Sequence, residues 1–203
     1  MKERFERLLD ACPLLAILRG ITTEEIPAVC DVLHESGIRI MEVPLNSPNA
    51  LESIKAAVRH CGDRMMIGGG TVLTTADAEG VCEAGGTFVV SPNTSADVIR
   101  RTKELGMVSM PGFFTPTEGF AALAAGADYL KLFPACLGPA YIKDLQAVIK
   151  ASIFAVGGVN ADNLPSFLKV CRGAGIGGAL YKAGKPLEQI AAAARELVLK
   201  IRN

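Results

Sequence analysis

The stretch Tyr-Leu-Lys-Leu-Phe-Pro at residues 129–134 places one cation inside a short apolar run that ends in a proline. Such a run is typical of a buried strand. Side chains alternate between the two faces of a strand, so Leu130 and Leu132 share one face and Lys131 lies on the other. If the two leucines pack on helices, Lys131 points to the opposite, inner side of the sheet.

Lys131 is the first candidate catalytic residue. A lysine is rarely buried without a partner or a function. An apolar site disfavours the ammonium form and lowers the pKa, which frees a neutral amine to attack a carbonyl and form a Schiff base. Two other interpretations stay open at this point, because the side chain could extend outward to solvent or form half of an ion pair.

Short apolar runs alternate with amphipathic segments along the whole chain. Eight runs predict strands, at 14–18, 38–43, 65–69, 87–90, 107–110, 128–133, 153–156 and 173–178. Helical segments are predicted at 23–36, 48–61, 74–84, 95–105, 115–125, 139–150, 160–170 and 186–201. This alternation predicts an α/β fold, a single (β/α)8 TIM barrel with an extra helix at 2–11 covering its bottom. An open doubly wound sheet is the alternative, and the lack of a linker predicts one domain over residues 1–203.

The bulk composition bounds the possible functions. Lys plus Arg and Asp plus Glu both number 21, so the net charge is zero and nothing indicates nucleic acid or an anionic membrane as a partner. No apolar stretch is long enough to span a bilayer. The six cysteines form no CxxC pair and most lie in apolar patterns, which is typical of reduced, buried thiols. We expect a cytoplasmic protein.

Polar residues recur where the predicted strands end, which is where (β/α)8 enzymes carry their catalytic groups. Alternation puts Glu42 on one face of the second strand with Ile38 and Ile40. We therefore expect Glu42 to point inward and to face Lys131, although a plain structural ion pair with Lys131 or Arg19 is also open. The other strand-end candidates are Arg19, Thr71 and Pro92.

Two glycine pairs follow the last two predicted strands. Residues 173–178 match GxGxxG, but they lie in a strand near the chain end rather than at a strand-to-helix turn, so we reject the dinucleotide-binding interpretation. Barrels often bind phosphate after strands seven and eight, and glycine lets backbone N–H groups approach an oxyanion. The pairs Gly157-Gly158 and Gly177-Gly178 are predicted to do this; tight turns alone are the other interpretation.

Metal and hydrolase chemistry receive little support. The only histidines, His34 and His60, fall on predicted helices away from the strand ends. A zinc site needs several converging ligands, and a Ser-His-Asp arrangement needs a histidine near the site. We expect no cofactor and no metal, although a divalent ion held by oxygens alone stays open.

Six motifs in order along the chain resemble a known family. They are ILRGI at 17–21, EVPLNSP at 42–48, GGGTVL at 68–73, SPN at 91–93, LKLFP at 130–134 and VGGV at 156–159. They resemble the bacterial 2-keto-3-deoxy-6-phosphogluconate/4-hydroxy-2-oxoglutarate aldolases, and most of all the branch that acts on 2-dehydro-3-deoxy-6-phosphogalactonate. The resemblance covers essentially the whole chain.

The resemblance implies a homotrimeric Schiff-base aldolase. The expected substrate is a 2-keto-3-deoxy sugar acid phosphate, and the expected products are pyruvate and D-glyceraldehyde 3-phosphate. The gluconate epimer and 4-hydroxy-2-oxoglutarate are alternative substrates, and a metal-dependent lyase, a phosphosugar isomerase or a non-catalytic phosphosugar-binding barrel are alternative classes. By motif, Lys131 forms the Schiff base, Glu42 moves protons, Arg19 and Thr71 bind the pyruvyl end, and Gly157, Gly177 and Gly178 bind the phosphate end.

The chain departs from the family pattern at three places. Asn46-Ser47 stand where the gluconate enzymes usually have Arg-Thr, which favours the galactonate branch. Gly178 stands where many relatives have serine, so a hydroxyl contact to phosphate is missing. Phe113-Phe114 replace smaller residues and are expected to reshape the aldehyde pocket.

Overall fold

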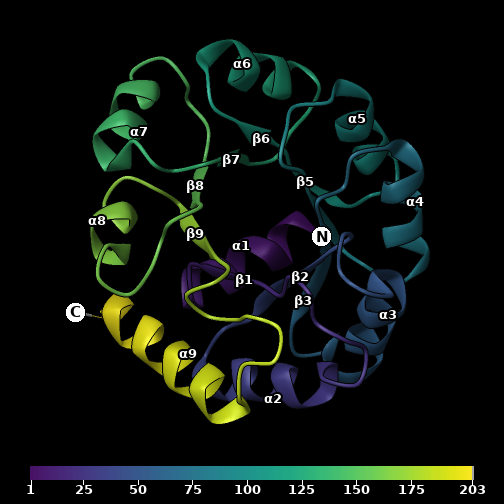
Figure 1. The fold of residues 1–203 in the computed structure, drawn as a ribbon. Helices are drawn as coiled ribbons and strands as arrows, with labels where there is room; N and C mark the ends of the chain where they lie inside the picture. Colours follow the sequence, from purple (N-terminus) through teal and green to yellow (C-terminus); the bar gives the residue numbers. More distant parts are fainter. Residues whose placement is uncertain (203) are drawn as a thin grey trace.

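Nine short parallel strands form the centre of the computed structural model, which describes residues 1–202 (Figure 1). Their order in the sheet is β5-β4-β3-β2-β1-β9-β8-β7-β6. The strands are β1 (Leu14–Ile17), β2 (Ile40–Pro44), β3 (Met66–Gly70), β4 (Phe88–Val90), β5 (Val108–Met110), β6 (Gly112–Phe113), β7 (Leu130–Leu132), β8 (Ile153–Val156) and β9 (Gly173–Ile176).

The sheet closes into a barrel at Pro111, which separates β5 from β6. Pro111 has no N–H to give to a strand ladder. The carbonyl of Ser109 accepts hydrogen bonds from the N–H groups of Asp128 (3.0 Å) and Tyr129 (3.2 Å), and that of Pro111 accepts from Lys131 (2.9 Å). The predicted fifth strand is therefore one interrupted strand. The (β/α)8 prediction is confirmed, and the open-sheet alternative is wrong.

Helices surround the barrel, as Figure 1 shows. Thr74 and Thr115 begin two of them with reciprocal capping boxes, because each hydroxyl accepts from the third helical residue and that residue's carboxylate accepts in return. The helices are α1 (Lys2–Ala11), α2 (Ile26–Ser36), α3 (Ala50–Cys61), α4 (Thr75–Glu83), α5 (Ala96–Glu104), α6 (Pro116–Ala124), α7 (Gly138–Gln146), α8 (Leu164–Leu168) and α9 (Leu187–Arg202).

The prediction of a helix over 160–170 was too long. The side chain of Asn160 accepts hydrogen bonds from the N–H groups of Asp162 (2.9 Å) and Asn163 (3.2 Å). This local turn competes with helix formation, and α8 begins only at Leu164.

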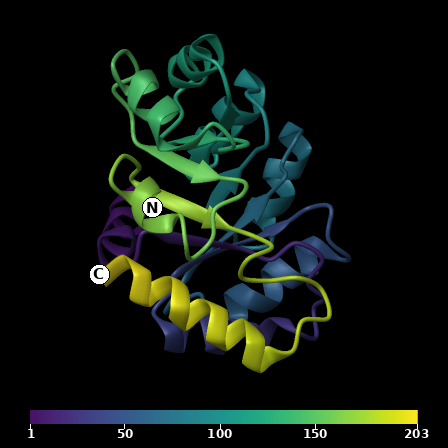
Figure 2. The ribbon, with the colours of Figure 1, turned by 60° about the vertical axis from the view of Figure 1, so that its left-hand side comes forward.

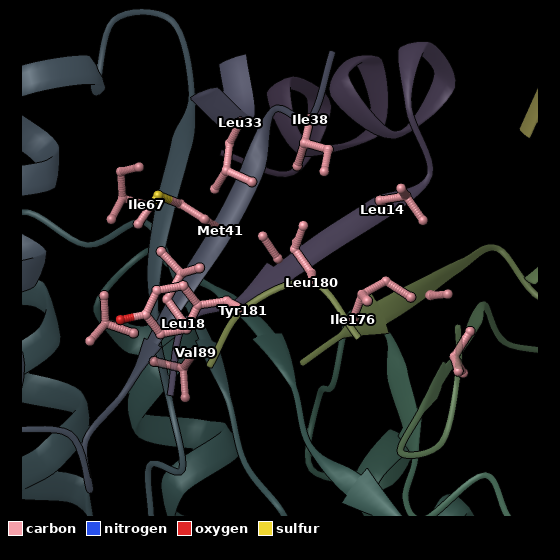
Figure 3. Close-up of a cluster of buried hydrophobic side chains, with 14 of the residues drawn as sticks. Leu14, Leu18, Leu33, Ile38, Met41, Ile67, Val89, Ile176, Leu180 and Tyr181 are labelled. Carbon is pink, nitrogen blue, oxygen red and sulfur yellow. The ribbon is translucent and has the colours of Figure 1, made fainter. Parts of the chain in front are cut away.

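Two apolar layers follow from strand alternation. The outer layer lies between strands and helices, and Figure 3 shows part of it, including Met41 and Leu33. The inner layer fills the barrel and includes Ile40. Ile38 was predicted to share the inner face with Ile40, but it packs in the outer layer (Figure 3). Ile38 precedes β2, and its N–H bonds the carbonyl of Leu33 at 3.0 Å, so it does not follow the strand period.

Helix α1 closes the bottom of the barrel, as the sequence predicts. Phe5 is fully buried, and its ring centroid lies 5.4 Å from that of Phe88 and 5.1 Å from that of Tyr129. Glu6 accepts a short hydrogen bond from the Tyr129 hydroxyl and pairs with Arg172 at 2.8 Å. Figure 2 shows α1 at the end of the barrel where the strands begin. The opposite end, where the strands finish, is left for a functional site.

None of the helices described over residues 1–202 has the length and apolarity needed to cross a bilayer. Five of the cysteines, namely Cys30, Cys61, Cys82, Cys136 and Cys171, carry free thiols.

Candidate active site

Lys131 lies inside the barrel on β7, as alternation predicts. Its neighbours Leu130 and Leu132 belong to the outer apolar layer. Only 5% of Lys131 is exposed, and its Nζ lies 4.8 Å from the centre of the Phe133 ring. Burial lowers the pKa of Lys131; the Glu42 carboxylate opposes this shift, and the Arg19 guanidinium adds to it. The amine is thus biased toward its neutral, nucleophilic form, and the outward-pointing interpretation is wrong.

Glu42 lies on β2 and is 1% exposed. Burial raises its pKa to about 7, while Lys131 and Arg19 act in the opposite direction. Within the described residues its Oε2 atom has no hydrogen-bond partner. Glycine at position 70 makes room for this carboxyl group, because a Cβ there would lie 2.4 Å from Oε2.

No ion pair among the described residues joins Glu42 to Lys131 or to Arg19. The interpretation of Glu42 as half of a structural ion pair is therefore wrong. A buried polar atom without a partner is rare in folded proteins and calls for an explanation. The explanation that fits here is a carboxyl group kept available for a proton or a ligand.

Arg19 follows β1 and extends over the mouth of the barrel. Its guanidinium donates a short hydrogen bond to Asn46 Oδ1, and both terminal nitrogens lie 3.4 Å from Thr71 Oγ1. Ser47 Oγ accepts from the N–H of Gly20 at 2.8 Å, which ties the loop after β1 to the loop after β2. Arg19 has no carboxylate partner in the described part of the chain, so its charge is free for an anion.

The glycine pairs lie on the neighbouring strand ends β8 and β9. Gly157 and Gly158 have φ angles of +95° and +82°, a region that side chains other than glycine rarely adopt. For the N–H groups of Gly158 and Gly178, no acceptor is found within residues 1–202. GxGxxG spans β9 and opens no helix, which agrees with rejecting a dinucleotide site.

These groups surround one cavity of about 350 Å³ at the top of the barrel. It brings together most of the predicted site residues: Arg19, Glu42, Lys131, Gly157, Gly158, Gly177 and Gly178. Thr71 reaches the site through its contact with Arg19. Pro92 is not among the residues that line the cavity. Its carbonyl oxygen packs against Gly112 instead, and a Cβ added to Gly112 would lie 2.3 Å from that oxygen.

Several lining residues were missed from the sequence. Phe133, Val156 and Ile17 give the cavity its apolar wall, and Asn160 and Ala179 complete the rim. The signal for Phe133 was present, because it shares the inner strand face with Lys131. The rim residues follow the strands in loops, where no periodicity marks them.

The remaining candidates lie elsewhere. His60, on α3, bonds Asp31 on α2 at 2.9 Å, outside the barrel. Over residues 1–202, no group of three or more His, Cys, Asp or Glu side chains is placed to hold a metal ion.

The geometry permits one kind of chemistry directly. A buried amine with a lowered pKa faces a cavity that it shares with a carboxyl group whose pKa is near 7. Such a pair can form an imine with a carbonyl compound and move protons around it. Arg19 at the rim and the amides of the glycine pairs can hold anionic groups on that compound.

Comparison with known proteins agrees with this chemistry. A family model described as "KDPG and KHG aldolase" matches residues 5–193. The chain is 44% identical to a 2-dehydro-3-deoxy-6-phosphogalactonate aldolase of Escherichia coli (strain K12), over 94% of this chain and 95% of that protein. It is 48% identical to a probable 2-dehydro-3-deoxy-6-phosphogalactonate aldolase of Rhizobium meliloti (strain 1021), over 85% and 83%.

More distant similarity extends to a second substrate class. A 2-dehydro-3-deoxy-phosphogluconate aldolase of Treponema pallidum (strain Nichols) is 32% identical, over 79% of each chain. Among solved structures, one described as native KDPGal superimposes with a TM-score of 0.91 at 44% identity and covers 94% of both chains.

Proposed function

This chain belongs to the KDPG and KHG aldolase family, whose members are carbon–carbon lyases, and we propose that it cleaves a 2-keto-3-deoxy sugar acid phosphate through a Schiff base on Lys131. One observation carries the proposal. A buried lysine without an ion-pair partner shares its cavity with a buried carboxyl group whose Oε2 is unpartnered. A structural role would have paired these charges, since leaving them apart costs stability.

The proposed reaction starts at the substrate ketone. The neutral Lys131 amine attacks C2 to give a carbinolamine, and a proton from Glu42 then allows its hydroxyl to leave as water, which gives a protonated imine and a Glu42 carboxylate. Glu42 removes the C4 hydroxyl proton while the C3–C4 bond breaks and its electron pair moves into the imine. This step releases the aldehyde and leaves an enamine. Glu42 returns the proton to C3, and water then hydrolyses the imine to pyruvate and the free amine.

The pKa of Glu42 near 7 supports the proton-shuttle role. A group that both takes and returns a proton works best when its pKa is close to the working pH. Burial supplies this shift from the ordinary carboxyl range. The same burial biases Lys131 toward the neutral form that the first step requires.

We assign the two ends of the substrate by charge. Arg19, supported by Thr71, is proposed to bind the carboxylate. The backbone amides at Gly157, Gly158, Gly177 and Gly178 are proposed to bind the phosphate. Pro92 remains a proposed substrate contact, although it does not line the cavity.

The favoured substrate is 2-dehydro-3-deoxy-6-phosphogalactonate, with D-glyceraldehyde 3-phosphate and pyruvate as products. The support is the higher identity to relatives of that name, 44% and 48%, than to the phosphogluconate relative, 32%. 2-Dehydro-3-deoxy-6-phosphogluconate and 4-hydroxy-2-oxoglutarate are the second candidates. Steady-state kinetics on both C4 epimers test this preference. A higher kcat/KM for the gluconate epimer would make the gluconate compound the preferred substrate.

Borohydride reduction in the presence of pyruvate tests the covalent step. The parent protein should gain one pyruvyl adduct on Lys131, located by mass spectrometry of peptides. Lys131→Met should lose both adduct and cleavage activity. Lys143→Met, on the outer helix α7, is the matched control and should keep both. An adduct that persists on Lys131→Met, attached to another lysine, would refute the assignment.

Two further experiments distinguish a Schiff-base aldolase from a metal-dependent lyase, an isomerase and a binding protein. A chelator should leave the cleavage rate unchanged, whereas a metal-dependent lyase would lose activity. An isomerase would turn over phosphosugar without forming a pyruvate adduct, and a binding protein would do neither. Glu42→Gln should slow turnover while some trapping persists; a variant as active as the parent would exclude the shuttle.

We also propose a homotrimeric assembly and a cytoplasmic location. A homotrimer follows from the family resemblance, and large apolar side chains left exposed on one chain are consistent with an interface; these include Leu73, Phe120 and Leu137. Free thiols at Cys30, Cys61, Cys82, Cys136 and Cys171 support a cytoplasmic location. We propose that no cofactor takes part, because the imine itself accepts the electron pair.

A further inference from the structure

One end of the cavity is formed by Gly157, Gly158, Gly177 and Gly178, and we call it the glycine end. Among the described residues, no cationic side chain lines this end. The charged side chains in the cavity wall are Arg19, Glu42 and Lys131. On the loops that follow β8 and β9, the polar side chain among the described lining residues is Asn160, and its oxygen already accepts from Asp162 and Asn163. A phosphate group carries close to two negative charges near neutral pH, so amides alone leave most of that charge uncompensated.

Lys182 lies at this end, just outside the cavity wall. A Cβ placed on Gly178 would lie 3.5 Å from Cε of Lys182, which is ordinary van der Waals contact. The amine is bonded directly to that Cε. A second cavity, of about 390 Å³, is lined by Gly178, Lys182 and Lys185, so Gly178 contributes to the walls of both cavities. The amine of Lys182 is thus close to Gly178, at the glycine end of the cavity.

The two lysines of this loop differ in what they contact. Lys185 Nζ donates to the carbonyls of Leu180 (2.9 Å) and Ala179 (3.5 Å), so it fixes the loop. Lys182 is exposed and has no ion pair or hydrogen bond to its side chain within residues 1–202. Its charge is therefore available to a ligand.

The backbone that carries Lys182 is held by hydrogen bonds before and after it, and its own carbonyl accepts from the N–H of Lys185 at 3.0 Å. The N–H groups of Leu180 and Tyr181 donate to the carbonyl of Gly177, at 2.8 and 2.9 Å. Tyr181 is 2% exposed, and its hydroxyl donates to Glu25, the residue before α2, at 3.2 Å. A charge held on a fixed loop beside Gly178 is pre-organised for an anion at the cavity mouth.

We propose that Lys182 binds the phosphate group of the substrate from the loop after β9, in place of the hydroxyl that is missing at Gly178. This inference rests on the proposed function and deepens it, because it makes Lys182 a determinant of the preference for phosphorylated over unphosphorylated 2-keto-3-deoxy sugar acids. Lys182 acts in binding and takes no part in the covalent steps at Lys131.

Steady-state kinetics of Lys182→Ala test the proposal. Its KM for the 6-phosphorylated substrate should rise about tenfold, the effect of one charge-assisted contact at a partly exposed site. Its kcat, and its kcat/KM for the unphosphorylated sugar acid, should match the parent. Lys182→Arg should retain most of the phosphate preference. Lys169→Ala removes another exposed lysine, which follows α8, and should change nothing.

Two outcomes overturn the proposal. Equal changes on both substrates would show that Lys182 acts elsewhere, and unchanged kinetics on both would show that it does not bind phosphate. Pyruvate trapping on Lys131 is measured in the same variant, so failure of the Schiff-base function is seen separately. If the parent forms no adduct, ³¹P NMR titration with inorganic phosphate still decides, because Lys182→Ala must bind phosphate more weakly than the parent.

Discussion

Glu42 is both the proposed proton shuttle and a buried carboxyl group that affects the stability of the fold. Its carboxyl group is buried, lacks a hydrogen bond to Oε2 and has its pKa raised to about 7. A group whose pKa is higher in the folded than in the unfolded chain favours folding only while it is protonated. From the ordinary value of 4.5, stability should therefore fall as pH rises to about 7.

Glu42→Gln removes this penalty. Relative to the parent, the variant should gain about 3 kcal/mol in free energy of unfolding between pH 4.5 and pH 8, since each unit of pKa shift is worth about 1.4 kcal/mol. Urea unfolding at both pH values measures the gain. A difference between variant and parent that does not change with pH would show that the carboxyl is not held near neutrality.

Gly70 controls the position of that carboxyl. In Gly70→Ala, the new Cβ would lie 2.4 Å from Glu42 Oε2, so the carboxyl must move. We expect kcat to fall about 100-fold, because a displacement near 1 Å at a reacting group has that effect. Pyruvate trapping on Lys131 should persist. Gly80→Ala on α4 is the control, since the three atoms nearest its Cβ belong to the flexible side chain of half-exposed Leu51. A parent-like rate in Gly70→Ala would contradict the role of Glu42.

At the scale of elements, α1 is part of the barrel core. Phe5 and Leu9 are buried among inner-layer residues, and the Phe5 ring contacts Phe88 and Tyr129. The polar edge of α1 is also fixed, since Glu6 bonds Tyr129 and Arg172. Without α1, the bottom of the inner layer would be open to water.

Phe5→Ala should lower the free energy of unfolding by about 3–5 kcal/mol, the range for removing a buried aromatic ring. Arg7→Ala, on the exposed side of the same helix, should stay within about 0.5 kcal/mol of the parent. Urea unfolding with an unchanged m-value measures both. A loss below 1 kcal/mol in Phe5→Ala would mean that α1 is not an integral part of the core.

At the scale of the whole molecule, the proposed homotrimer rests on the family resemblance and on exposed apolar side chains. Light scattering after gel filtration should give three times the protomer mass. Phe120→Glu or Leu137→Glu should reduce that mass if the side chain lies in the interface, because a buried charge without a partner is strongly unfavourable. A protomer mass for the parent protein at micromolar concentration would refute the trimer. The extent of the domain, 1–203, also stays a prediction, and Asn203 lies outside the described residues.

The sequence alone predicted the alternation of strands and helices and the inward direction of Glu42 and Lys131, and the structure then excluded the open sheet and the outward-pointing lysine. These predictions depend on local rules: strand alternation over two or three residues, and the convergence of parallel strand ends. The triglycine at 68–70 shows what sequence patterns along one strand do not predict. The sequence marks it as a strand end, but only the structure shows that Gly70 makes room for the Glu42 carboxyl.

The tertiary structure decided how far apart the functional groups lie. It left Glu42 and Lys131 without an ion pair, put Pro92 outside the cavity wall and placed the Phe133 ring beside Nζ of Lys131. It also moved Ile38 to the outer layer and interrupted the fifth strand at Pro111. These features depend on the tilt and closure of strands that are distant in the chain, and residue spacing along one strand carries no information about such distances.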